Sequence, residues 1–163
     1  MIVVVADTSP LNYLLRIGCE RLLPELYGKV FIPPAVLREL RDPGTPEIVR
    51  AFLYRAPEWI VLAGAMQPIA DRVLAELDPG EREAIQLALE KSADLVLMDE
   101  RTGVRVARER GLRVTGTLGV LLQASTRDLT EIEPALTRLQ ATDFRCTPNL
   151  IARVRQLARL PGL

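Results

Sequence analysis

Short apolar runs alternate with helical segments along the whole chain, and this alternation is the strongest constraint on its fold. The runs are continuous rather than alternating in polarity, which is typical of strands that helices cover on both faces. Strands joined through helices form right-handed crossovers and hence a parallel sheet. The sequence therefore predicts an α/β fold with three layers and a central parallel sheet of about five strands. The candidate strands are 2–6 (IVVVA), 29–32 (KVFI), 59–62 (WIVL), 94–98 (DLVLM) and 113–115 (RVT).

Helix start signals lie between these runs. Proline at a first turn, with Ser, Thr or Asp just before it, marks a helix N-terminus. A chain of 163 residues without repeats or linkers predicts one domain over 1–163, in which 131–163 forms a C-terminal helical extension. The expected helices begin near Ser9 and at Pro46 and span 33–40, 80–91, 101–110, 117–125, 131–141 and 149–159.

Composition excludes several kinds of chemistry. The chain has no histidine, so histidine bases, Ser-His-Asp triads and histidine-ligated zinc are absent. Cys19 and Cys146 lie far apart and are expected to be small apolar residues of the interior. The start of the chain lacks the basic region of a signal peptide, and no apolar run approaches the roughly 20 residues of a membrane span. We expect a cytoplasmic protein whose chemistry depends on carboxylates.

Two acids stand where predicted strands end. Asp7 directly follows the first strand, and Asp99 directly follows the fourth. Ligands of open parallel sheets bind at the carboxyl ends of the strands, which is where both acids are predicted to lie. Glu39, beside the apolar stripe of a short helix, is a third candidate. The alternatives are a helix N-cap for each aspartate and a solvated surface position for the glutamate.

Glu81 is the fourth candidate. On a helical wheel it falls on the same face as Ala84, Ile85 and Ala88, where an unpaired carboxylate is unfavourable. The alternative is a capping box, since Asp78 and Glu81 have the D-x-x-E spacing and a proline follows the aspartate. Both interpretations predict that Glu81 lies near the N-terminus of a helix.

Four carboxylates at one sheet edge would repel one another without a cation. Oxygen ligands without His or Cys favour Mg²⁺ or Mn²⁺ over zinc. One or two such ions activate water and stabilise the leaving oxygen in phosphodiester hydrolysis. The residues Asp7, Glu39, Glu81 and Asp99 are therefore the predicted metal ligands and catalytic residues.

Five stretches of the chain together cover about residues 2–125: "VVVADTSPLNYLLRIG", "VFIPPAVLREL", "LDPGEREAIQLALE", "ADLVLMDERTGVRVARERGL" and "VTGTLGVLL". In this order they resemble PIN-domain ribonucleases, including the VapC-type toxins of toxin–antitoxin pairs. They are most similar to small VapC-like PIN proteins first catalogued as a domain of unknown function.

The resemblance implies the strand order 3-2-1-4-5, which brings Asp7 and Asp99 onto neighbouring strands. It implies that Asp7, Glu39, Glu81 and Asp99 form the acidic quartet of a metal-dependent endoribonuclease. Ser9 and Thr117 would lie near the metal as supporting hydroxyls, with Thr8 and Asn12 as further candidates; the alternative for each hydroxyl is a helix cap. Implied partners are structured RNA (tRNA or rRNA), a small antitoxin protein and a second copy of the chain.

Arginines follow the last predicted acid. Arg101, Arg105 and Arg108 share one side of a helix and are predicted to bind RNA phosphates, the alternative being a solvated amphipathic face. Four more arginines follow residue 143, and these are a second candidate surface for RNA or an acidic partner.

Arg101 occupies a position at which many PIN toxins carry another acid, two residues after the aspartate of the fourth strand. This departure favours the alternative function, a PIN-fold module that binds RNA or protein without cleavage.

Overall fold

A computed structural model describes residues 2–160 and contains a five-stranded, wholly parallel sheet. The strand order is β3-β2-β1-β4-β5, which confirms the predicted α/β class and strand order. Each strand is slightly shorter than the apolar run that predicted it. The strands are β1 (Val4–Ala6), β2 (Val30–Ile32), β3 (Ile60–Leu62), β4 (Leu95–Leu97) and β5 (Val114–Thr115).

Ten helices lie within residues 2–160, and all eight predicted helices are present. The sequence patterns missed α2 and α5, which have six and five residues. Helices this short have almost no periodicity; α2 depends on burying four apolar side chains against the core, and α5 on a cap from Asp71. The helices are α1 (Thr8–Arg16), α2 (Leu22–Tyr27), α3 (Pro34–Leu40), α4 (Glu47–Tyr54), α5 (Arg72–Glu76), α6 (Pro79–Glu90), α7 (Arg101–Glu109), α8 (Thr117–Thr126), α9 (Ile132–Gln140) and α10 (Pro148–Ala158).

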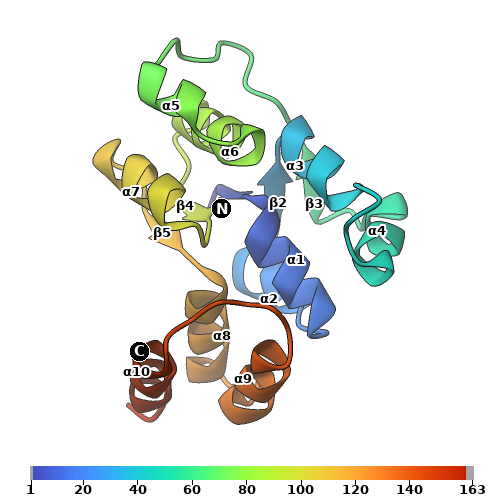
Figure 1. Ribbon diagram of the computed structural model, residues 1–163, viewed down its shortest axis with the longest axis vertical. Helices are drawn as coiled ribbons and strands as arrows, with labels where there is room; N and C mark the ends of the chain where they lie inside the picture. The colour runs from blue at the N-terminus through green and yellow to red at the C-terminus, as the bar shows by residue number, and fades with distance from the viewer. Residues whose placement is uncertain (1, 161–163) are drawn as a thin grey trace.

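The sheet separates two apolar cores. Val4 and Ala6 of β1 face one core, which also takes side chains from α1, α2, α4, α8, α9 and α10. Val5 faces the other, which α5, α6 and α7 complete. Figure 1 shows these two groups of helices on opposite sides of the sheet. The central strand β1 is fully buried, and β2 and β4 each have only one partly exposed residue, in agreement with continuous apolar runs. The edge strand β3 is only partly covered, with Leu62 54% exposed.

The predicted C-terminal extension, described to residue 160, packs onto the domain. Both α9 and α10 contact α8, below the sheet in Figure 1. Their buried residues Leu136, Leu139 and Ile151 belong to the same core cluster as Val4. Residues 131–160 therefore share a continuous apolar core with the sheet; residues 1 and 161–163 of the predicted domain lie outside the described part.

Two expectations from composition can be compared with the structure. Cys19 is buried, as expected, whereas Cys146 is only partly buried; both are free thiols. Among residues 2–160, no helix has both the length and the apolar character needed to cross a membrane.

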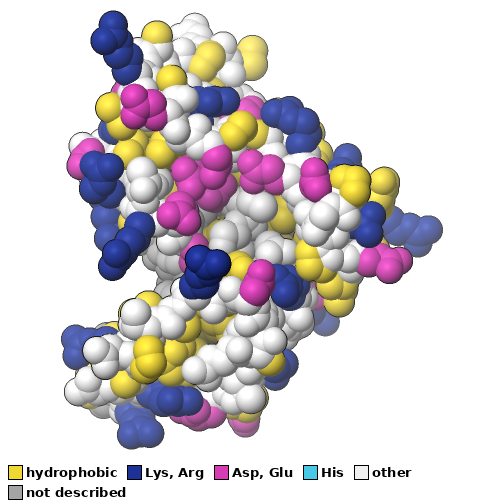
Figure 2. Space-filling model, viewed as in Figure 1, with side chains coloured by type: hydrophobic (Ala, Val, Ile, Leu, Met, Phe, Trp, Pro, Cys, Tyr) yellow, Lys and Arg dark blue, Asp and Glu magenta, His cyan; other side chains and the backbone are white. Residues whose placement is uncertain are grey.

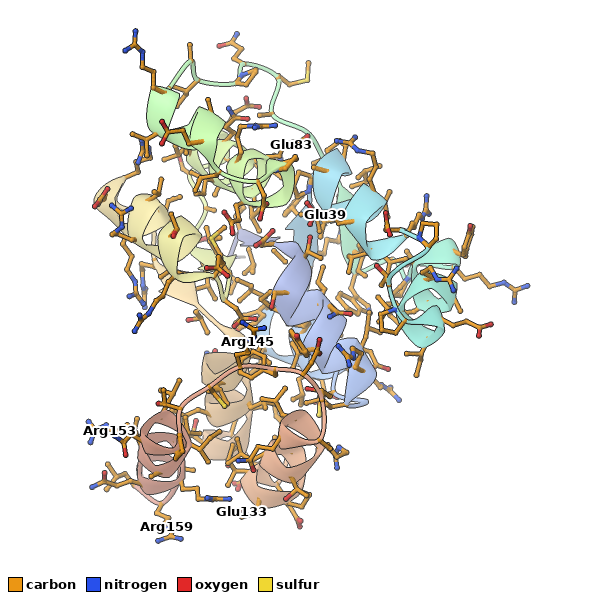
Figure 3. The ribbon with its side chains drawn as sticks, in the orientation of Figure 1. Glu39, Glu83, Glu133, Arg145, Arg153 and Arg159 are labelled. Carbon is orange, nitrogen blue, oxygen red and sulfur yellow. The ribbon has the colours of Figure 1, made fainter. Side chains whose placement is uncertain are left out.

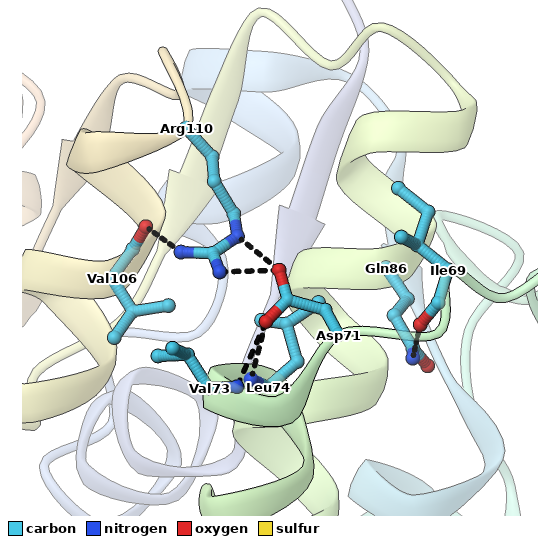
Figure 4. Close-up of polar contacts among 7 residues, drawn as sticks. All are labelled: Ile69, Asp71, Val73, Leu74, Gln86, Val106 and Arg110. Atoms are coloured by element: carbon cyan, nitrogen blue, oxygen red, sulfur yellow. Dashed lines mark hydrogen bonds and ion pairs between the residues drawn. The ribbon is translucent and has the colours of Figure 1, made fainter.

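An ion pair fixes α5 to α7. The Asp71 side chain caps α5 by accepting hydrogen bonds from the Val73 and Leu74 amides, and it also pairs with the Arg110 guanidinium just after α7 (Figure 4). Arg110 also donates to the Val106 carbonyl at 3.2 Å. One aspartate thus both starts α5 and ties it to the neighbouring helix.

The substitution Arg110→Ala should loosen α5 without changing the rest of the fold. Hydrogen exchange measured by mass spectrometry should show faster exchange across 72–77, because α5 is too short to persist without its tertiary anchor. Arg105→Ala is the matched control, since its 3.2 Å pair with Glu109 lies wholly within α7. Equal exchange in the two variants would show that the ion pair does not hold α5.

Candidate metal centre

Asp7 lies at the carboxyl end of β1 and is almost completely buried. Its amide donates to the Leu97 carbonyl at 2.9 Å, which ties it to the end of β4. It occupies the N-cap position of α1, but its side chain makes no capping hydrogen bond there, and only 5% of the residue is exposed. The capping alternative therefore does not explain this carboxylate.

Asp99, just beyond β4, accepts hydrogen bonds from two helices. The hydroxyls of Ser9 and Thr117 each donate to Oδ2 at 2.7 Å, and the Thr117 amide donates to Oδ1 at 2.7 Å. Gly116, the N-cap residue of α8, has no side chain, so Asp99 supplies the cap from the neighbouring strand end. Neither hydroxyl caps its own helix, and both orient the Asp99 carboxylate.

Glu39 meets Asp7 at the start of α6. It accepts hydrogen bonds from the Thr8 hydroxyl and from the Gly80 amide, the latter at 3.1 Å. A Cβ on Gly80 would lie 2.8 Å from both Glu39 oxygens and 3.0 Å from Asp7 Oδ1, so the two carboxylates converge on one point. Figure 3 shows Glu39 where α1, α3 and α6 come together. Asn12, one turn along α1, has a buried Oδ1 without a hydrogen-bond partner.

Glu81 lies on the buried face of α6, as the helical wheel predicts, and is 4% exposed. Asp78 caps the helix by accepting from the Glu81 amide at 2.9 Å, which confirms the first half of the capping box. The Glu81 side chain instead extends towards α7, where a Cβ on Gly103 would lie 3.1 Å from its carboxyl carbon. Glu81 is therefore held between α6 and α7.

We name these four carboxylates (Asp7, Glu39, Glu81 and Asp99) the acidic cluster, and burial and repulsion raise the pKa of two of them, Asp7 and Glu81. Burial is the largest cause that raises the pKa of Asp7 to about 7, and the negative charges of three neighbours add to it. Those neighbours are Asp78, Glu39 and Asp99. Burial, followed by the charges of Asp78 and Asp7, raises the pKa of Glu81 to about 8. Asp78 is thus a fifth acid beside the cluster.

The acidic cluster is chemically suited to a hard divalent cation. None of the ion pairs among residues 2–160 involves any of its members, so no arginine or lysine neutralises it. Within the described residues, no three Cys, Asp or Glu side chains are grouped closely enough to hold an ion as they stand. Mg²⁺ commonly binds through one or two carboxylates, keeping waters and adding substrate phosphates. The convergence of Asp7 and Glu39 suits that mode of binding.

Three glycines that sequence reasoning missed shape the cluster. Gly80 leaves room for Glu39, and Gly103 leaves room for Glu81. A Cβ on Gly116 would lie 2.6 Å from Asp99 Oδ1. A glycine before a helix resembles an ordinary cap in the sequence, so only the close approach of a carboxylate reveals this role.

The predicted RNA-binding arginines lie beside the cluster. Arg101, Arg105 and Arg108 are exposed on α7 and, together with Asp99, line a cavity of about 360 Å³. Arg105 is engaged by Glu109 at 3.2 Å. Figure 2 shows acidic side chains gathered in the middle of this face, with basic side chains on the flank formed by α7. The charges are therefore separated on the surface although the chain as a whole is neutral.

The arginines after residue 143 do not form one surface. Arg153 and Arg159 point outward from α10, away from the acidic cluster, whereas Arg145 lies close to α1 (Figure 3). Arg155 pairs with Glu133 of α9 at 2.8 Å. Arg145 is therefore the arginine of this region that is placed near the cluster.

The substitution Asp7→Asn should stabilise the metal-free protein at alkaline pH. The pKa of Asp7 is about 7 in the folded state, against an ordinary value of 3.8. Between pH 3.8 and pH 7 the folded protein therefore keeps the proton on Asp7, whereas the unfolded chain has lost it. Stability contributed by this group therefore falls as pH rises through that window and is lowest above pH 7. A neutral amide removes this penalty, so the melting temperature at pH 8 should rise by roughly 5 °C, with a smaller rise at pH 5.

Differential scanning fluorimetry in EDTA at both pH values measures this difference. Glu83→Gln is the control, because Glu83 is an outward-facing acid on α6 whose only ion pair is a 3.5 Å contact with Arg38. A lower melting temperature for Asp7→Asn than for the wild type at pH 8 would show that the buried carboxylate stabilises the metal-free fold.

Comparison with known protein families agrees with the observed fold. A family profile described as a PIN domain matches residues 3–159, which is nearly the whole chain. A search of curated proteins returns no match to the chain. The matched region includes the five parallel strands, the acidic cluster and the helices after β5. PIN domains have a nuclease-type fold, and this chain belongs to the PIN-domain family.

Proposed function

We propose that the protein is an endoribonuclease that depends on Mg²⁺ or Mn²⁺ and hydrolyses phosphodiester bonds of RNA. The observation that carries this proposal is the convergence of Asp7 and Glu39 beside Asp99 and Glu81, without a paired cation among residues 2–160. A structural role would not require buried like charges to gather at one edge. Phosphodiester hydrolysis with a hard metal ion does require such a group of oxygens.

Each member of the acidic cluster has a distinct role in this proposal. Asp7 and Glu39 would hold one ion, with Asp99 and Glu81 completing the ligand set directly or through water. When bound, the metal supplies an activated water and stabilises the leaving oxygen. Ser9 and Thr117 fix the orientation of Asp99 through their 2.7 Å hydrogen bonds.

The role of toxin in a type II toxin–antitoxin pair is part of the same proposal and rests on the resemblance to VapC-type proteins. It implies a small antitoxin that covers the acidic cluster and a homodimer of the chain. Growth arrest on expression in a host, relieved by co-expression of the neighbouring small gene, is the direct observation that distinguishes a toxin from another ribonuclease.

The second candidate is a PIN-fold module that binds RNA or protein without cleaving it. Two observations favour it: Arg101 stands where many PIN toxins carry an acid, and no three acids of residues 2–160 close around one point. Metal-dependent cleavage separates the two candidates.

Cleavage of a mixture of tRNA and rRNA fragments should require both the metal and the acidic cluster. Loss of a residue that only supports a metal ligand typically lowers activity by roughly 10- to 100-fold. Asp7→Asn and Glu81→Gln should each lower the cleavage rate by more than this, and EDTA should abolish cleavage. Glu83→Gln is the matched control, two residues from Glu81 on the outer side of α6. If wild type and Asp7→Asn leave the RNA intact but still bind it, the binding module is the correct function.

The variant Gly116→Ala tests whether the position of Asp99 matters. The backbone of Gly116 (φ −93°, ψ −176°) is extended and open to alanine, but the added methyl would meet Asp99 Oδ1 at 2.6 Å. Displacement of this carboxylate should lower cleavage by about 10- to 100-fold, with only a small change in melting temperature. Gly64→Ala is the control, because its Cβ would contact only Pro34 at an ordinary 3.6 Å. Equal activity of the two variants would exclude Asp99 from the reaction.

A further inference from the structure

A second, larger pocket opens on Asp99. It has a volume of about 560 Å³ and lies between α7, α8 and the α9–α10 connection (141–147). We name it the Asp99 pocket. Its volume is within the range of sites that enclose small organic ligands. Asp99 and Ser9 form its boundary with the acidic cluster, so a ligand here would lie directly beside the proposed reaction site.

The lining of the Asp99 pocket combines apolar and aromatic side chains with charged ones. Phe144 packs edge to face against Tyr13, with ring centroids 4.9 Å apart and planes at 80°. Val104 of α7 and Leu118 of α8 line it from either side, and Leu150, 46% exposed, also lines it. Such a surface can pack against the flat face of a nucleobase, which stacks on apolar and aromatic side chains.

Two arginines supply the positive charge of the pocket. Arg108 and Arg145 both line it, and neither forms an ion pair within residues 2–160. Three acids also line the pocket: Asp99 and Glu100 on the side of the acidic cluster, and Asp143 on the opposite side. The Asp143 carboxylate is already engaged by Arg16 at 2.7 Å and by the Tyr13 hydroxyl at 3.0 Å. The guanidinium groups are therefore free to bind an anion, and a planar guanidinium binds phosphate through two hydrogen bonds.

We propose that the Asp99 pocket binds the ribonucleotide next to the scissile phosphate, with its base against the apolar lining and its phosphate on Arg108 and Arg145. This inference rests on the proposed ribonuclease function. An RNA strand whose phosphodiester reaches Asp99 must place a neighbouring nucleotide on one side of it, and the pocket is the adjoining space.

The test measures binding and cleavage separately. Binding of a fluorescein-labelled pool of RNA hexanucleotides is followed by anisotropy with Mg²⁺ in an Asp7→Asn background. Arg145→Ala and Leu150→Asp should each weaken binding by about 5- to 10-fold, and Arg145→Ala should lower the slope of log affinity against log salt by about 0.7. Leu150→Asp introduces a negative charge at an exposed site in the first turn of α10, where an acid favours the helix.

Arg153→Ala is the matched control, since it removes the same charge from an arginine that points away from the pocket (Figure 3). Its affinity should stay within about twofold of the parent, as a distant exposed charge is largely screened. In the otherwise wild-type chain, Arg145→Ala should slow cleavage of the same hexanucleotides by a similar factor, and Arg153→Ala should not.

The outcomes separate this inference from the proposed function. If the wild type cleaves RNA while Arg145→Ala and Leu150→Asp bind and cut like the parent, the ribonuclease stands and the pocket is not a nucleotide site. Equal losses in Arg145→Ala and Arg153→Ala would also overturn the inference, since they indicate attraction by overall charge. If the wild type does not cleave RNA, and Arg145→Ala and Leu150→Asp bind RNA more weakly while Arg153→Ala does not, the ribonuclease proposal fails. The pocket is then an RNA site of the binding module.

Discussion

Negative charge buried at the carboxyl edge of the sheet must be balanced, and the local structure depends on how this is done. The acidic cluster lies where α1, α6 and α8 begin, so the partial positive charge of three helix N-termini faces the carboxylates. Free first-turn amides act directly: Gly80 donates to Glu39, and Thr117 donates to Asp99. Backbone dipoles offset only part of the burial penalty, because the pKa of Asp7 is still raised to about 7. In the proposed function, a divalent cation would supply the remaining positive charge.

Close approach of backbone and carboxylate is the second requirement. Gly80, Gly103 and Gly116 each lie so near a carboxylate that a methyl group would intrude. Gly80 and Gly103 lie in the first turns of α6 and α7, and Gly116 lies just before α8. Because these glycines leave space for the acidic side chains, helix α6 can approach α3 and α7 with Glu39 and Glu81 held between them. The three glycines thus determine where the carboxylates can lie.

Sequence patterns predict those features that depend on local periodicity or on a strand end. Continuous apolar runs located all five strands, and the position of Asp7 and Asp99 after two of them placed both at one edge. The face of Glu81 followed from helical periodicity. In contrast, Ser9 and Thr117 bind a carboxylate 90 and 18 residues away, which no local pattern contains; only the family resemblance indicated these two hydroxyls. The Asp99 pocket was missed because Tyr13, Val104 and Phe144 meet only after the α9–α10 connection folds back over the sheet edge.

If the protein is the proposed ribonuclease, the opposing charges on this face make metal binding and RNA binding interdependent. Phosphodiesters and the acidic cluster repel each other, so without a divalent cation the arginines of α7 and the α9–α10 connection must overcome that repulsion. A cation between carboxylate and phosphate converts repulsion into attraction. Because such coupling is reciprocal, RNA must then raise the affinity for the cation by the same factor. An incomplete set of ligands in the free protein is thus compatible with the proposed catalysis, since the phosphate of an RNA substrate would supply the remaining oxygens.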